Sequence, residues 1–176
     1  SLLILALGLS LQACGFVITD VIVLPESENT NVFPLSVRVE LRESSLNTLD
    51  STWHKESFRK SLLRYIQRRG TFREVVDGPS DLILTIDAKY TETSSGFIDK
   101  TYRHNFSIAA RLTVGERLQS PDSQVLGSYT GTESSSPKVP AIWSAAPIVE
   151  TMSAALDRLF QKIERDREII LAKAGI

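Results

Sequence analysis

The chain's only cysteine, Cys14, follows an apolar run and a small residue near the N-terminus. The apolar segment, residues 2–11 with the sequence LLILALGLSL, is too short to cross a bilayer, because a spanning helix needs about 20 apolar residues. A thiol is a nucleophile that can accept a lipid, and a single cysteine excludes an internal disulfide. We weigh two roles for Cys14: a site of covalent modification, or a buried free cysteine in an N-terminal strand.

The sequence LQAC at residues 11–14 resembles the lipobox of bacterial lipoproteins. The resemblance implies that residues 1–13 are a signal peptide, that a peptidase cuts before Cys14, and that diacylglycerol is attached to its sulfur. Two or more acyl chains anchor a protein stably in a membrane. Because the chain begins at Ser1 without the charged region of a secretory signal, we expect this signal to be truncated at its N-terminus. The residue after the cysteine is Gly15 and not aspartate, which resembles the pattern of lipoproteins that are sorted to the outer membrane.

Basic side chains dominate residues 53–69, WHKESFRKSLLRYIQRR, in which Glu56 is the only acid. Lys60, Arg64 and Arg68 recur every four residues, so they line one face of the helix that this segment predicts. The functional interpretation is a surface for anionic groups such as lipid phosphates, LPS or an acidic partner. The competing interpretation, which we favour, is a solvated helix face.

A second candidate contact surface lies in the segment VPAIWSAAP, residues 139–147. Ile142 and Trp143 stand there between prolines and small residues. An exposed tryptophan in this place would indicate a contact with a partner or with lipid. The alternative, which we favour, is that Trp143 covers the core of the sheet.

Residues that could catalyse a reaction form no recognisable constellation. His54 and His104 are far apart in the sequence, and we expect His104, next to Arg103, at the surface. The sequence has no metal-ligand spacing, no glycine-rich phosphate loop and no G-x-S-x-G elbow. Its carboxylates on predicted strand ends and loops include Asp81, Asp87 and Asp99, but any globular protein offers as many. We predict no catalytic residue, no metal and no cofactor other than the covalent lipid on Cys14.

Hydrophobic periodicity predicts the elements that must position these residues. Alternation of apolar and polar residues predicts half-buried strands, and apolar residues at helical spacing predict two helices, the second of them long. Gly70 ends the first helix, and the glycines at 127 and 131 indicate a bulge or a close backbone approach. The predicted strands cover residues 35–41, 72–76, 81–91, 104–114 and 125–131, and the predicted helices cover residues 53–69 and 147–172.

This order predicts an α+β fold with an antiparallel or mixed sheet of about four to five strands, covered on one face by two helices. The successive alternating strands with short links indicate an antiparallel meander. The chain has 176 residues, 42% of them hydrophobic, which suffices for one domain with a real core. We assign residues 1–13 to the signal peptide, 14–32 to the lipidated cysteine and linker, and 33–176 to a single domain. The formal net charge of −1 gives no general attraction to nucleic acid.

The element order behind a lipobox resembles small envelope lipoproteins of the LPS-assembly type, and also CsgG-like and penicillin-binding-protein-activator lipoproteins. The resemblance rests on CGF at residues 14–16 and on the passage from Phe58 through GTF at 70–72 to DLIL at 81–84. It implies a non-enzymatic lipoprotein that binds or assembles an envelope complex, and it assigns a role to no individual residue of the domain. The alternatives are a module that binds anionic lipid or glycan, and an enzyme with an unrecognised site.

Overall fold

The computed structural model describes residues 22, 32–42, 55–97, 101–118, 124–136 and 146–176. Cys14, His54, Asp99, Ile142 and Trp143 lie outside these residues, and so do the signal peptide and most of the predicted linker.

Five strands form one mixed sheet in the order β2-β1-β3-β4-β5. β1 is parallel to both β2 and β3, whereas β4 is antiparallel to β3 and to β5. This arrangement confirms the predicted α+β class and the antiparallel meander of the last three strands. The elements are β1 (Phe33–Leu41), α1 (Lys55–Arg69), β2 (Phe72–Val75), β3 (Leu82–Ser95), β4 (Thr101–Val114), the short 3-10 helix η2 (Glu116–Leu118), β5 (Val125–Ser135), α2 (Ala146–Arg165) and α3 (Arg167–Ala174).

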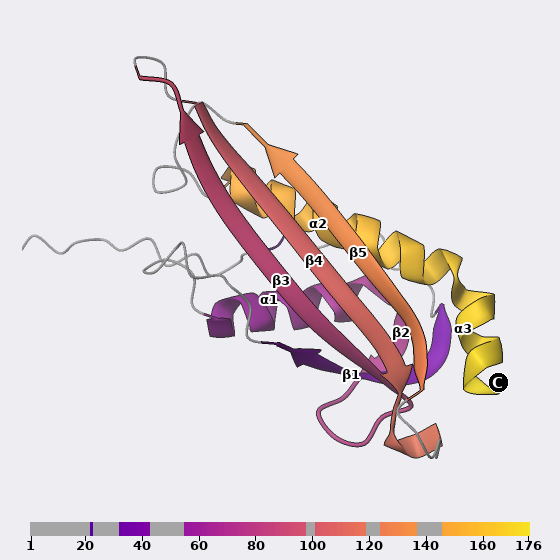
Figure 1. Cartoon of the computed structure of the whole chain (residues 1–176). Helices are drawn as coiled ribbons and strands as arrows, with labels where there is room; N and C mark the ends of the chain where they lie inside the picture. Colours follow the sequence, from indigo (N-terminus) through magenta and orange to yellow (C-terminus); the bar gives the residue numbers. More distant parts are fainter. Residues whose placement is uncertain (1–21, 23–31, 43–54, 98–100, 119–123, 137–145) are drawn as a thin grey trace, which may run out of the picture.

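The helices α1 and α2 lie on one face of the sheet (Figure 1). The even-numbered residues from Leu82 to Tyr90 of β3 and from His104 to Val114 of β4 point toward them and are buried, as alternation along a strand requires. Leu84 and Leu112 are register partners in this layer, and both are fully buried. Phe58 of α1 packs edge-on against Phe106 of β4, with ring centroids 6.2 Å apart. The core therefore lies between the sheet and the two helices.

The other face of the sheet is open across the described residues. Odd-numbered residues of β3 and β4 and even-numbered residues of β5 from Ser128 onward point to it, and most of them are polar and exposed. Hydroxyl side chains are especially frequent along β5, at Ser128, Thr130, Thr132 and Ser134. The one-sided covering that the sequence predicted is thus seen in the burial pattern.

The strands at the polar end of the sheet run further than predicted. β3 continues to Ser95, β4 already begins at Thr101, and β5 continues to Ser135, beyond the predicted strand bounds of 91, 104 and 131. Backbone pairing reaches the end of this hairpin, since Ser95 is the register partner of Thr101. Polar side chains give no apolar alternation there, and backbone hydrogen bonds do not depend on it.

The single long helix predicted over residues 147–172 is wrong, because Asp166 divides it into α2 and α3. Asp166 has φ −87° and ψ 14°, which lies outside the helical range, and Gly175, with φ 78°, caps the C-terminal end of α3. The apolar stripe continues across the break, since Ile163 and Ile170 are both fully buried. Periodicity alone therefore did not reveal the division.

His104 is fully buried, contrary to the surface position that we expected. It shares the inward phase of β4 with Phe106, and its Nδ1 lies 2.6 Å from the hydroxyl oxygen of Tyr90. Glu92 Oε2 lies 3.4 Å from the same nitrogen. The neighbouring Arg103 suggested a surface, but adjacent residues of a strand point to opposite faces.

Candidate functional site

The predicted cationic residues of α1 lie on its exposed side. Lys60, Arg64 and Arg68 are exposed, whereas Phe58, Leu62, Tyr65 and Ile66 of the same helix are buried. The structure thus places the three cations on the side of α1 that faces away from the core. Whether they bind anions stays a prediction.

Arg69, the last basic residue of α1, belongs to a different environment. Its side chain is only 8% exposed, and its Nε and Nη1 lie 2.7 Å from Glu164 and 2.8 Å from Asp157 of α2. Its Nη1 also donates to the Tyr65 hydroxyl oxygen. Burial lowers the pKa of Arg69, but the hydrogen bond to Glu164 and the neighbouring charges raise it overall. Arg69 therefore joins α1 to α2 and is no part of the exposed basic surface.

Asp81, one of the carboxylates considered from the sequence, is held in a structural contact. The backbone N–H and the hydroxyl of Ser36 both donate to its Oδ2 at 2.8 Å. Burial raises the pKa of Asp81, but these hydrogen bonds and the charges of Arg73 and Arg117 outweigh it and hold the pKa below 3.8. The carboxylate ties the start of β3 to β1, which is a stabilising role.

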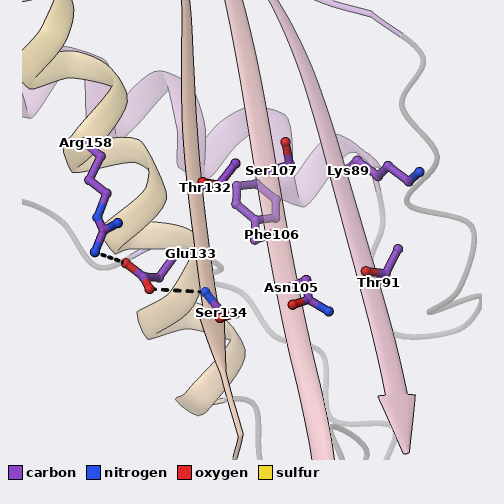
Figure 2. Close-up of a pocket in the computed structure, with 9 residues that line it drawn as sticks. All are labelled: Lys89, Thr91, Asn105, Phe106, Ser107, Thr132, Glu133, Ser134 and Arg158. Atoms are coloured by element: carbon purple, nitrogen blue, oxygen red, sulfur yellow. Dashed lines mark hydrogen bonds and ion pairs between the residues drawn. The ribbon is translucent and has the colours of Figure 1, made fainter.

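A shallow groove of about 630 Å³ lies on the open face near the polar ends of β4 and β5 (Figure 2). Strands β3, β4 and β5 contribute its polar lining, and Arg158 reaches it from α2, where it pairs with Glu133 at 2.6 Å. Such a lining can hydrogen-bond and attract charge, but it contains no cysteine or histidine that could act as a nucleophile or base. The polar lining includes Lys89, Thr91, Asn105, Ser107, Thr132 and Ser134.

A second hollow, of about 430 Å³, lies beside the first and shares Thr132 and Arg158 with it. Its other lining residues are Gln161, Lys162 and Arg165, all from α2. Thr132, in β5, therefore lies between two hollows. Thr132 lies beyond the end of the predicted strand 125–131, so periodicity did not reveal this place. The hydroxyl residues at every second position were the available signal.

The sheet edge formed by β5 makes contacts with the helices through its backbone. Lys162 Nζ donates to the carbonyl oxygen of Thr130 at 2.7 Å, and Lys173 Nζ donates to that of Leu126 at 3.1 Å. The N–H of Ser134 donates to the carboxylate of Glu133 at 3.2 Å. In the described part of the chain, β4 is the only strand that pairs with β5.

Within the described ranges, histidines, cysteines and carboxylates form no group that could hold a metal ion. None of the described helices combines the length and the apolar character needed to cross a membrane.

The fold is similar to that of a solved bacterial protein. Protein XCC0632 from Xanthomonas campestris (family-model DUF330) matches with a TM-score of 0.55 and 13% identity, over 88% of this chain and 96% of that one. At this identity the likeness shows a shared fold alone.

Two bacterial lipoproteins are also similar, with lower TM-scores. The minor lipoprotein from Acinetobacter baumannii matches with a TM-score of 0.44 and 11% identity, over 80% of this chain and 93% of that one. Lipoprotein GNA1162 from Neisseria meningitidis matches with a TM-score of 0.32 and 15% identity, over 66% of this chain and 94% of that one. No family model and no curated protein matches the sequence. The resemblance to LPS-assembly and CsgG-like lipoproteins stays a prediction.

Proposed function

We propose that this chain is a lipid-anchored bacterial envelope lipoprotein that acts without catalysis, by binding a partner protein in an envelope complex. The lipid is attached to Cys14, and the domain faces the periplasm from the outer membrane. The observation that carries the binding role is the open, polar sheet face beside the edge of β5. A broad flat surface of hydroxyl, amide and charged groups suits a protein contact better than it suits the enclosure of a small substrate.

The anchor is tested at Cys14. We expect Cys14→Ala to lose labelling by a fatty-acid probe and to move from the membrane fraction to the soluble fraction. Cys14→Ser, which keeps the size but not the thiol, should behave in the same way. Labelling that persists in either variant would contradict the lipoprotein assignment.

The binding face is tested by cross-linking in intact bacteria. A photo-cross-linking residue in place of Ser107 lies in the groove on the open face, and the same residue in place of Gln67 lies on the exposed side of α1. We expect one discrete cross-linked protein from position 107 and none from position 67. Equal products from both positions, or none from position 107, would overturn the assignment of the open face as the binding surface.

A second candidate function is the binding of anionic lipid or glycan by the exposed cations of α1. It is favoured by the common exposure of Lys60, Arg64 and Arg68 on a helix side that buries none of the core. Charge-neutral variants of these three residues, measured against anionic-lipid vesicles, test it.

A further inference from the structure

The backbone of β5 points alternately toward β4 and away from the sheet. In an antiparallel strand the N–H and C=O of one residue point to the same side, and this side alternates along the strand. Because lysines from the helices reach the carbonyls of Leu126 and Thr130, these residues turn their backbone outward. Ser128 and Thr132 share this phase, so their N–H and C=O groups also point away from β4.

The register shift near the start of β5 agrees with this phase. Val114 donates to the carbonyl of Gln124, which therefore points toward β4 although its number is even. The shift lies between Leu112 and Thr113 of β4, opposite the first residues of β5. Before the shift an even-numbered residue, Gln124, directs its carbonyl toward β4, and after it the odd-numbered residues of β5 direct their backbone groups there.

This edge is long and carries few of the features that block strand addition. β5 has 11 residues, about twice the usual strand length, and contains no proline or lysine of its own. The capping lysines are exposed side chains that come from α2 and α3. Each holds its carbonyl through a single hydrogen bond, which an incoming backbone N–H can replace.

The charges beside the edge specify what kind of strand fits it. On the helix side, four cations contact β5 or line the hollow next to it, against two carboxylates; the cations are Arg158, Lys162, Arg165 and Lys173, and the carboxylates are Glu133 and Asp166. On the open side, from Ser128 to Ser134, the edge presents only neutral hydroxyls. A strand with acidic residues toward the helices and uncharged residues toward the open face therefore complements both sides.

A second copy of β5 does not fit this description. Pairing of two β5 strands would bring the Arg158, Lys162 and Arg165 side chains of both copies to the same seam. Like charges placed together in an interface are strongly unfavourable.

We propose that an extended acidic segment of the partner protein adds to β5 as a sixth strand, with its carboxylates directed at Arg158, Lys162 and Arg165. Strand addition of this kind takes its affinity from main-chain hydrogen bonds and its specificity from alternate side chains. The inference rests on the proposed function, a protein partner at this face, and names the chemistry of that partner.

The experiment measures amide exchange in the full chain, in mild detergent, with two synthetic probes of about nine residues. One peptide alternates threonine and glutamate, and the other alternates threonine and lysine. We expect the glutamate peptide to slow amide exchange at Ser128, Thr130 and Thr132 by about tenfold or more. Exchange at Tyr129 and Gly131, which already pair with β4, should not change.

Charge reversal of the edge provides the matched variants. We expect Lys162→Glu with Arg165→Glu to abolish the protection by the glutamate peptide and to favour the lysine peptide. The same reversal at two exposed cations of α1, Lys60→Glu with Arg68→Glu, should leave the preference unchanged.

The proposal is overturned if the glutamate peptide protects none of the three amides, if both peptides protect them equally, or if the α1 reversal has the same effect as the edge reversal. Cross-links from position 107 that persist in such a case would leave the proposed function standing and remove only the acidic strand. If the glutamate peptide gives no protection and position 107 gives no cross-link, the protein partner is overturned together with the acidic strand.

Discussion

Gly131 in β5 lies directly against the backbone of Ala155 in α2: a Cβ built on Gly131 would lie 2.0 Å from the Ala155 carbonyl oxygen. The atom that this Cβ would meet belongs to the backbone, so no flexible side chain can move aside to make room. The missing Cβ lets α2 lie close along the edge strand. The close backbone approach that the sequence indicated for the glycines of this strand is confirmed here.

We expect Gly131→Ala to lower the free energy of unfolding by about 1–3 kcal/mol, because the added methyl group overpacks the contact between β5 and α2. Denaturant unfolding measures the change. Gly78→Ala is the matched control, since nothing lies within 4 Å of its Cβ position. Equal effects of the two substitutions would contradict the close packing of α2 on β5.

Leu84 and Thr85 are adjacent in β3 but face opposite sides of the sheet. Leu84 is fully buried, whereas Thr85 lines a hollow on the open face. We expect Leu84→Asp to prevent folding, because a buried carboxylate without a partner is very costly, and Leu84→Ala to cost about 2–5 kcal/mol. Thr85→Asp should leave a cooperative unfolding transition by circular dichroism. Comparable damage at both positions would show that the second face is also covered.

Arg69 and Arg68 are neighbours at the end of α1 with opposite surroundings. We expect Arg69→Ala to cost about 3–5 kcal/mol, because it leaves Glu164, whose side chain is 15% exposed, without its cation. Arg69→Lys should recover only part of this loss, since an ammonium group cannot reach both carboxylates as the planar guanidinium does. Arg68→Ala should change stability by less than about 0.5 kcal/mol. Thermal unfolding of the three variants checks the order.

The hydrogen bonds from Ser36 to the Asp81 carboxylate should make the stability of the fold depend on pH. The folded pKa of Asp81 lies below the ordinary 3.8, so the ionised carboxylate stabilises the fold at pH values above that figure, and this contribution is lost as the pH falls through the folded pKa. We expect Asp81→Asn to cost about 1–3 kcal/mol at pH 7 and progressively less below about pH 4. Asp87→Asn, at an exposed position of the same strand, should cost little at any pH. A difference between wild type and Asp81→Asn that stays constant down to about pH 2 would contradict the assigned contact.

The exposed cations of α1 separate the two candidate binding functions. The triple variant Lys60→Gln, Arg64→Gln and Arg68→Gln should fold normally, because surface substitutions usually change stability by less than about 0.5 kcal/mol each. If this face is only solvated, as we expect, binding to anionic-lipid vesicles at low salt will be weak and equal in both proteins. Vesicle binding that the triple variant loses would favour the anion-binding function. Salt-resistant binding that survives would direct attention to Trp143.

Local periodicity was enough to predict much of the fold. The alternation at Leu82, Leu84 and Ile86 identified the buried face of β3, and the spacing of Phe58, Leu62 and Tyr65 identified the buried face of α1. These patterns are legible because the side-chain period of a strand or helix is fixed by its backbone geometry. The candidate site was predicted less well, since only the position of the cations on α1 could be derived in this way.

Tertiary structure decided what depends on contacts between distant residues. Arg69 meets Glu164 across 95 positions of the chain, and β1 pairs in parallel with β3 although α1 and β2 lie between them. The position of β5 at the sheet edge, with Thr132 between two hollows, follows from the order of the strands. Backbone hydrogen bonds form between any two strands of suitable shape, so the sequence of one strand does not name its neighbour. The sequence by itself determined which faces are buried and marked Cys14; only the folded chain decided which backbone groups and charges remain at the surface for a partner.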